Sequence, residues 1–485
     1  MIARSPIVAI LGHVDHGKTT LLDYLRKSQI AAKEFGGITQ KIGGYSVNTG
    51  IKDYQTETIT FIDTPGHEAF SKLRARGATV ADIAILVIDG KDSIMPQTVE
   101  SIAHIKAANI PFIVTITKSD LPDSNPEKVK RDLLKHDVLT ENKGGKVPVV
   151  SVSAKTGSGI NELLETILLI ATDLNLTYDP KNSLQAHIIE NKKDRRGIVA
   201  SVIVKDGTLK VGNDVYFENK KTRVKSLIND LGASVSQVFP STPCELLGFE
   251  FIPPVGATIT GLESASSQTI VDQQTLSESS NFSLESILNT KVEEKKLVVV
   301  VKTDNQGSLE AINQILANNP RIKVILAAVG AIHQSDIFLA KASKGIVIGF
   351  SIKPDKEVVE ISKQEKVIIK TYNIIYELVD ELTEVAQLLH IKETKEKNLK
   401  GEAKVQMTFI IENEKIYGIK MIKGKLNLDD EIEVYRDNHL FGKTKLISLH
   451  TRAKKIQEIR KEQEAGMIFS PPLDICVGDV VKCIL

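Results

Sequence analysis

Residues 12–19 read GHVDHGKT and fit the pattern G-x-x-x-x-G-K-[ST]. The apolar run 7–11 (IVAIL) precedes this stretch, and KTTLLDYLRKS, with the apolar period of a helix, follows it. A loop between a strand and a helix offers its backbone N–H groups and the helix N-terminus to phosphate oxygens. The alternative is a chance glycine turn before a helix. We predict a phosphate-binding loop made of Gly12, His13, Val14, Asp15, His16, Gly17, Lys18, Thr19 and Thr20.

Further β-branched runs follow at residues 59–63, 83–89, 112–116 and 147–152. Their continuous apolar character is typical of parallel strands that are buried on both faces. Stretches of helical period such as QTVESIAHIKAAN and INELLETILLIATDL lie between them. This alternation predicts a doubly wound α/β domain over residues 1–177.

The stretch FIDTPGH supplies a second set of candidate residues at a strand end. Within the predicted loop, Lys18 reaches the β- and γ-phosphates and the Thr19 hydroxyl binds Mg²⁺. A carboxylate at Asp63 can hold Mg²⁺ through water. Gly66 lets the backbone approach a γ-phosphate, and His67 can orient a water for in-line attack, although alone it would pass for a solvated loop histidine. Thr39, in GGITQ, can close on the same Mg²⁺. The predicted switch residues are Thr39, Asp63, Thr64 and Pro65.

A candidate base pocket follows the strand at residues 112–116, in FIVTITKSDLP. Its Lys118-Ser119-Asp120 fits the end of the guanine signature Asn-Lys-x-Asp, but Thr117 stands where Asn is usual. A carboxylate at Asp120 accepts both N1–H and the 2-amino group of guanine, which adenine cannot supply. We therefore expect GTP and GDP binding, weakened less than tenfold by Thr117. The predicted pocket is Thr117, Lys118, Ser119, Asp120, Ser153, Ala154 and Lys155. In their order these motifs predict a GTPase domain of Ras-like topology.

The rest of the chain changes pattern several times. Residues 183–263 show strands without helices, which predicts a β-barrel, with the turns KDGT and KVGND at hairpin positions. A Ser/Gln-rich linker is expected at 264–295, a smaller α/β domain at 296–376, a connecting helix at 377–396 and a C-terminal β-barrel at 397–485. The predicted architecture is multidomain, α/β plus β.

Composition excludes several classes of protein. The chain has 485 residues and a formal net charge of +1, so no global field draws it to nucleic acid or membrane. The three cysteines form no C-x-x-C pair, which argues against a disulfide framework or a zinc site. No apolar run reaches 18 residues, and the N-terminus lacks the flanks of a signal peptide.

Several stretches resemble the translational GTPases, and within them bacterial-type translation initiation factor two. They are GHVDHGKT, GGITQKIGGY, DTPGHEAFSKLRARGA, GTLKVGND, VKTDNQGSLEAI, YNIIYELVDE and YRDN. They are spread over nearly the whole chain. The resemblance implies GTP or GDP with Mg²⁺ at Thr19, Thr39 and Asp63, and water positioning by His67. It also implies an apolar gate made of Val14 and Ile38 around that histidine.

The resemblance further implies that the C-terminal barrel grips the formylmethionyl end of initiator tRNA. The residues at matching positions are Arg436, His450, Thr451, Arg452, Glu464, Ala465 and Gly466. This chain departs from the family here. His450, Thr451 and Arg452 stand where two basic residues and an aromatic are usual, and Ala465 replaces a cysteine. Arg452, Lys454 and Lys455 would compensate for the missing basic residues, because attraction to phosphate tolerates small shifts in position. The alternative is that these residues form a solvated basic face.

The implied function is a ribosome-stimulated GTPase acting in translation initiation. Its partners would be the 30S and 50S ribosomal subunits and formylmethionyl initiator tRNA, with no membrane and with the chain as a monomer. Bacterial cytoplasm and an organelle matrix or stroma both fit. Two alternatives are another translational GTPase and a GTP-regulated ribosome-binding scaffold with little hydrolysis.

Overall fold

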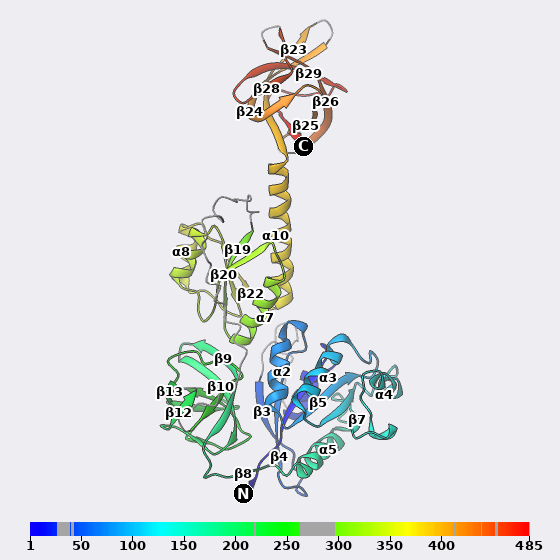
Figure 1. Cartoon of the computed structure of the whole chain (residues 1–485), viewed down its shortest axis with the longest axis vertical. Coiled ribbons are helices and arrows are strands. Elements are labelled where there is room, and N and C mark those ends of the chain that lie inside the picture. The colour runs from blue at the N-terminus through cyan, green and yellow to red at the C-terminus, as the bar shows by residue number, and fades with distance from the viewer. Residues whose placement is uncertain are drawn as a thin grey trace, which may run out of the picture. The chain divides into compact units, whose positions relative to one another are not determined.

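A computed structural model of the chain describes residues 1–26, 39, 43–217, 220–261, 296–411, 414–437, 439–451 and 454–484 (Figure 1). It divides into two compact units, one formed by Met1–Asn281 with Val298–Leu382 and the other by Phe282–Leu297 with Thr383–Leu485. The expected linker at 264–295 lies outside the described residues, as do Ile38 and Arg452. No helix in the described ranges is long and apolar enough to cross a membrane.

The N-terminal domain is built on a six-stranded sheet. Its order is β3 (Gly43–Asn48), β4 (Thr58–Asp63), β2 (Ile7–Gly12), β5 (Ile83–Asp89), β6 (Phe112–Thr117) and β7 (Val149–Ser151). β2 and β5 are buried along their whole length, as expected for central parallel strands. The edge strand β3 was not predicted, and it pairs antiparallel with β4. Its sequence, GGYSVN, opens with two glycines and lacks a β-branched run.

Helices cover both faces of this sheet. On one face α1 (Lys18–Arg26) and α5 (Ile160–Asp173) bury their apolar residues. On the other face lie α2 (Ser71–Val80), α3 (Pro96–Ala108) and α4 (Pro126–Leu134). Two short 3₁₀ turns, η2 (Glu68–Phe70) and η3 (Glu141–Lys143), complete the domain. The doubly wound prediction is confirmed. Because parallel strands end at one edge, the loops after β2, β4, β6 and β7 lie along it.

An antiparallel β domain follows. Its eight-stranded sheet runs β13 (Lys220–Arg223), β12 (Asp214–Phe217), β18 (Thr258–Thr260), β9 (Gln185–Asp194), β10 (Gly197–Asp206), β17 (Pro243–Leu247), β14 (Ser226–Asn229) and β15 (Ser234–Val235). Two small ribbons pair β11 (Leu209–Lys210) with β16 (Gln237–Val238), and β1 (Ile2–Ala3) with β8 (Thr177–Tyr178).

The hairpin positions expected for KDGT and KVGND were wrong. β10 pairs with β9 and β17, and β11 pairs with β16, so neither turn joins two paired neighbours. The chain leaves the main sheet at Gly207, whose φ of +70° favours glycine, and β11 starts a separate ribbon.

A smaller four-stranded sheet forms the next domain. Its order is β20 (Ile322–Val329), β19 (Leu297–Thr303), β21 (Ile346–Phe350) and β22 (Ile369–Tyr372). Within it β21 pairs parallel with β19 and with β22. The helices that alternate with these strands are α7 (Gln306–Ala317), α8 (Gln334–Ala342) and α9 (Lys356–Gln364), and the long α10 (Ile375–Lys397) follows β22.

The second unit contains a closed six-stranded barrel. The ring runs β23 (Leu399–Ile411), β30 (Val480–Ile484), β25 (Glu431–Arg436), β26 (His439–Thr451), β29 (Glu464–Ser470) and β24 (Glu414–Asn427), and β24 pairs back with β23. Short strands β27 (Lys454–Lys455) and β28 (Glu458–Arg460) add to β26 and β24. The predicted C-terminal barrel is confirmed.

Candidate functional site

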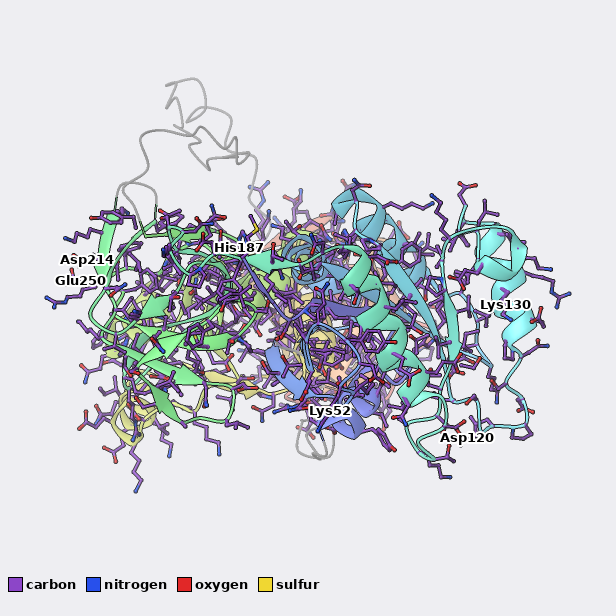
Figure 2. All side chains as sticks on the ribbon, turned by 90° about the horizontal axis from the view of Figure 1, so that it is seen from below. Lys52, Asp120, Lys130, His187, Asp214 and Glu250 are labelled. Carbon is purple, nitrogen blue, oxygen red and sulfur yellow. The ribbon has the colours of Figure 1, made fainter. Side chains whose placement is uncertain are left out.

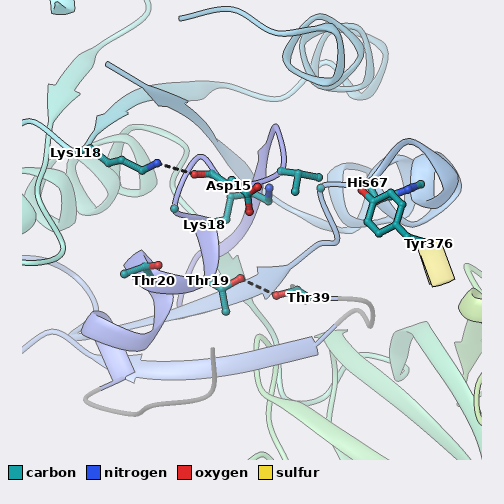
Figure 3. Close-up of a pocket in the computed structure, with 11 residues that line it drawn as sticks. Asp15, Lys18, Thr19, Thr20, Thr39, His67, Lys118 and Tyr376 are labelled. Carbon is teal, nitrogen blue, oxygen red and sulfur yellow. Dashed lines mark hydrogen bonds between the residues drawn. The ribbon is translucent and has the colours of Figure 1, made fainter. Parts of the chain in front are cut away.

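A cavity of about 260 Å³ opens at the carboxyl edge of the N-terminal sheet (Figure 3). Its walls come from the loop after β2, the start of α1, the loop after β4, the loop after β6 and the first turn of α10. The lining residues are Val14, Asp15, Gly17, Lys18, Thr19, Thr20, Thr39, Gly66, His67, Lys118 and Tyr376. The structure thus brings most of the predicted phosphate-binding residues and the switch residue Thr39 to one place.

The loop after β2 encloses the amine of Lys18, which is buried. The Lys18 Nζ donates to the carbonyl of Gly12 at 3.0 Å and also to that of His13. A Cβ at Gly66 would lie 2.9 Å from the Val14 nitrogen and closer still to Lys18 Nζ, so only glycine lets this backbone come so near. Burial lowers the pKa of Lys18, and the charge of Asp63 opposes this shift. The loop therefore presents a cation and backbone donors, which suits phosphate.

Three oxygen-bearing side chains meet beside the loop. The hydroxyls of Thr19 and Thr39 lie 2.7 Å apart, and Thr39 donates to Asp63 Oδ2 at 3.3 Å. Asp63 Oδ1 is buried and has no hydrogen-bond partner among the described residues. Burial raises the pKa of Asp63, although Lys18 acts against the shift. Hard oxygen donors with one unsatisfied carboxylate oxygen fit Mg²⁺.

His67 stands at the opposite wall of the cavity. Its Nδ1 accepts a hydrogen bond of 2.8 Å from the Ala69 N–H and so caps η2. Its ring packs on Tyr376 with the ring centroids 4.3 Å apart, and on Phe70 at 5.9 Å. Burial and the charge of Arg74 lower the pKa of His67. Both causes favour the neutral imidazole.

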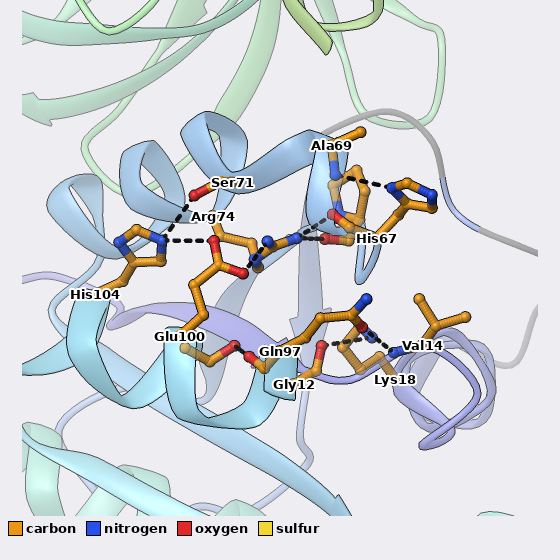
Figure 4. A network of polar contacts seen from close by, with 12 residues as sticks. Gly12, Val14, Lys18, His67, Ala69, Ser71, Arg74, Gln97, Glu100 and His104 are labelled. Carbon is orange, nitrogen blue, oxygen red and sulfur yellow. Dashed lines mark hydrogen bonds and ion pairs between the residues drawn. The ribbon is translucent and has the colours of Figure 1, made fainter. Parts of the chain in front are cut away.

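A buried network holds the loop that carries His67 (Figure 4). The fully buried Arg74 donates to the carbonyl of Pro65 at 3.1 Å and to that of His67, and its guanidinium pairs with Glu100 at 2.6 Å. Gln97, one turn before Glu100 on α3, accepts from the Val14 N–H at 3.1 Å. Sequence reasoning missed these residues. The available signal was a charged residue on the apolar face of α2, beside Leu73 and Gly77.

The predicted base pocket divides into a buried and an exposed part. Thr117 is buried, and its hydroxyl donates to the carbonyl of His16 at 2.6 Å. Lys118 Nζ lies 2.7 Å from Asp89 and 2.9 Å from the carbonyl of Asp15. Asp120 is exposed and points outward at the edge of the domain (Figure 2). A hydrogen bond from Ser153 holds the pKa of the Asp120 carboxyl below its usual range.

The remaining predicted residues of this domain take supporting positions. Thr64 is buried and donates to the carbonyl of Ile10 at 2.7 Å. The buried ring of His16 accepts from the Asp89 N–H at 3.2 Å and meets the ring of His13 edge-on. The Ser119 N–H donates to the Val152 carbonyl at 3.2 Å, which places it against Ser153, Ala154 and Lys155 just after β7.

The residues predicted to grip tRNA fall into two groups. His450 and Thr451, at the end of β26, lie beside Glu464, Ala465 and Gly466 of β29, and His450 is paired with Gly466. Ser448 and His450 are joined by a hydrogen bond of 2.8 Å.

Arg436 does not join this group. It faces His439 at the start of β26, and its guanidinium pairs with Asp479 at 2.9 Å and lies over the ring of Phe441. Its charge is therefore already partnered within the barrel.

Three family models match parts of the chain. Residues 3–173 match the family model of the elongation factor Tu GTP binding domain, 183–262 that of elongation factor G domain 2, and 273–383 that of translation-initiation factor 2. The fold, the phosphate loop and these matches define the class of the chain as the translational GTPases.

The particular family follows from whole-chain relatives. The chain is 39% identical to translation initiation factor IF-2 of Geobacillus sp. (strain WCH70), over 99% of this chain and 67% of that protein. It is 40% identical to IF-2 of Parvibaculum lavamentivorans, over 99% of this chain and 56% of that protein. The chain belongs to the translation initiation factor IF-2 family and spans a little over half the length of several of these relatives. The crystal structure of GDP-bound aIF5B from Aeropyrum pernix matches at 25% identity and a TM-score of 0.47, covering 99% of this chain and 92% of that one.

Proposed function

We propose that the chain is a GTP-dependent translation initiation factor. In this role it promotes binding of formylmethionyl initiator tRNA to the small ribosomal subunit and the joining of the subunits, and GTP is hydrolysed on the ribosome. The observation that carries the proposal is the cavity lined by Lys18, Thr19, Thr39 and His67, with Asp63 hydrogen-bonded to Thr39.

Different residues around the cavity would bind the phosphates, hold Mg²⁺ and orient the attacking water. Backbone N–H groups of the loop, with Lys18, bind the β- and γ-phosphates. Thr19 and Thr39 would hold Mg²⁺, with Asp63 acting through water, and the ion when bound neutralises charge on the phosphates. Gly66 brings its backbone next to the γ-phosphate. His67 orients the attacking water, and Thr64, Pro65 and Arg74 hold its loop in shape.

Guanine is read by Asp120, with Lys118, Ser119 and residues 153–155 forming the rest of the pocket. Thr117 supports the guanine pocket by its hydrogen bond to the His16 carbonyl in the phosphate loop. A titration with GTP, ATP and XTP tests this assignment. Asp120→Asn should lose affinity for GTP by a hundredfold or more and gain it for XTP, because the amide can donate to a 2-oxo group. Comparable binding of ATP and GTP by the unaltered protein would overturn the assignment.

We further propose that Val14 and Ile38 form the apolar gate beside His67, with Ile38 outside the described residues. The C-terminal barrel, residues 397–485, would take the formylmethionyl end of the tRNA. The adjacency of His450 and Thr451 to Glu464, Ala465 and Gly466 supports a single site there, next to Lys454 and Lys455 on β27. Arg452 lies outside the described residues, and Arg436 would act apart from this group, because it pairs with His439 at the start of β26. A monomer in the bacterial cytoplasm, or in an organelle matrix, fits this role.

The deciding experiment is GTP turnover with and without 30S and 50S subunits and initiator tRNA. Turnover should be slow for the protein alone and rise strongly with ribosomes, and His67→Ala should abolish the rise. Preference for formylated over unformylated initiator tRNA separates an initiation factor from another translational GTPase. Nucleotide binding without ribosome stimulation would favour a scaffold and overturn the proposal.

A further inference from the structure

An aromatic side chain from a distant part of the sequence reaches the nucleotide cavity. Tyr376 lies in the first turn of α10, just after the sheet strand β22, and lines the cavity together with Lys18 and Gly66. Its ring packs on that of His67 at a centroid distance of 4.3 Å and an angle of 58° (Figure 3). The α/β domain of residues 296–376 therefore contributes a side chain next to the histidine.

The hydrogen bond of His67 determines which nitrogen carries its proton. Since the Ala69 N–H donates to Nδ1, the neutral ring must hold its proton on Nε2. The free edge of the ring is then a donor and accepts no hydrogen bond from a water. A water prepared for attack needs its proton accepted, so this is a resting orientation. For Nδ1 to accept a hydrogen bond from the water, the ring must first break its hydrogen bond with the Ala69 N–H, which caps η2.

Leaving that cap also breaks the packing on Tyr376. Paired aromatic rings stabilise each other beyond the area that they bury, so leaving the cap costs the ring this stabilisation as well. We propose that Tyr376 is a positioning residue that keeps His67 in its resting orientation and thereby restrains GTP turnover by the free protein. This inference rests on the proposed function, because it presumes that His67 serves hydrolysis.

The first test reads the ring itself and needs no nucleotide. The ten histidines of the full chain are labelled at Cε1, and His67 is assigned by its loss in His67→Gln. In Tyr376→Ala the His67 signal should shift. The pKa of His67 should rise toward about 6.5, because loss of the tyrosine ring relieves the burial that lowers this pKa, while the charges of Arg74 and Glu68 stay in place. Tyr376→Phe should keep the unaltered signal. Phe338→Ala, an exposed aromatic on α8 of the same domain, is the matched control. An unchanged His67 signal in Tyr376→Ala would overturn the inference.

The second test is single-turnover GTP hydrolysis without ribosomes. Tyr376→Ala should hydrolyse GTP about two- to tenfold faster than the unaltered protein, the range that corresponds to one aromatic pair. Tyr376→Phe and Phe338→Ala should match the unaltered protein. If the His67 signal shifts but the hydrolysis rate stays the same or falls, Tyr376 positions His67 without restraining GTP turnover, and that part of the inference is overturned. No hydrolysis by any form, even with ribosomes, would instead overturn the proposed function.

Discussion

The hydroxyl of Thr117 donates to the backbone carbonyl of His16 across 2.6 Å and so joins the end of β6 to the phosphate loop. Both groups are buried, so water cannot replace this hydrogen bond. The unusual threonine of the guanine signature thus has a structural task at the loop, on the side away from solvent.

Replacing Thr117 by valine should weaken GDP binding about tenfold, because the valine keeps the volume but leaves the His16 carbonyl unsatisfied. A titration with fluorescent GDP measures the effect. Thr115→Val is the matched control on the same strand, since the buried Thr115 hydroxyl has no hydrogen-bond partner among the described residues. Equal affinities of the two variants would contradict this role of Thr117.

The Thr19–Thr39–Asp63 cluster predicts a difference between GTP and GDP. Thr39→Val should lower the affinity for a non-hydrolysable GTP analogue about tenfold and leave GDP nearly unchanged, since under the proposed function Thr39 would hold Mg²⁺ only when a γ-phosphate is bound. Isothermal titration with and without Mg²⁺ checks this result, and chelation of Mg²⁺ should erase the difference between variant and unaltered protein. Equal losses for both nucleotides would count against it.

Arg74 should be critical for stability. Arg74→Met removes the guanidinium that two backbone carbonyls and the Glu100 carboxylate share, so the free energy of unfolding should fall by about 3 kcal/mol or more. Arg76→Met on the same helix removes a more exposed pair with Glu310 and should cost about 1 kcal/mol or less. Urea denaturation of the full chain compares them, and similar losses would argue against a special role for Arg74.

Glu190 predicts a dependence of stability on pH. Burial raises its pKa to about 7, and its Oε1 accepts from the Gly307 N–H at the start of α7 while Oε2 has no hydrogen-bond partner among the described residues. A carboxyl whose pKa is raised in the folded state keeps its proton to higher pH there than in the unfolded state. Stability should therefore fall by up to about 3 kcal/mol as pH rises from about 4.5 to 7.

Glu190→Gln should remove most of this slope and make the protein more stable than the unaltered chain at pH 8. Denaturation midpoints between pH 5 and 8 measure it. Glu250→Gln changes an exposed carboxyl of the same β domain (Figure 2) and should keep the slope. A Glu190→Gln variant with the original slope would refute the assignment.

Short-range patterns predicted the fold of the N-terminal domain and many of the residues that line its cavity, because GHVDHGKT and DTPGH each specify a loop within a few consecutive residues. Long-range contacts left no such pattern. Gln97 reaches Val14 across 83 positions, and Tyr376 reaches His67 from another domain. The predicted hairpins of the β domain are absent for the same reason. A turn motif does not specify which strands the two segments that flank it will pair with.

The ring of the C-terminal barrel gives each of its six strands a hydrogen-bonded neighbour on both sides. Where a strand of the ring is paired on both sides, its backbone groups are already used, and a partner cannot extend the sheet there. Recognition along these stretches relies on side chains and on the loops at the barrel ends. Exchanging these residues could then change what the barrel selects while its scaffold stays intact.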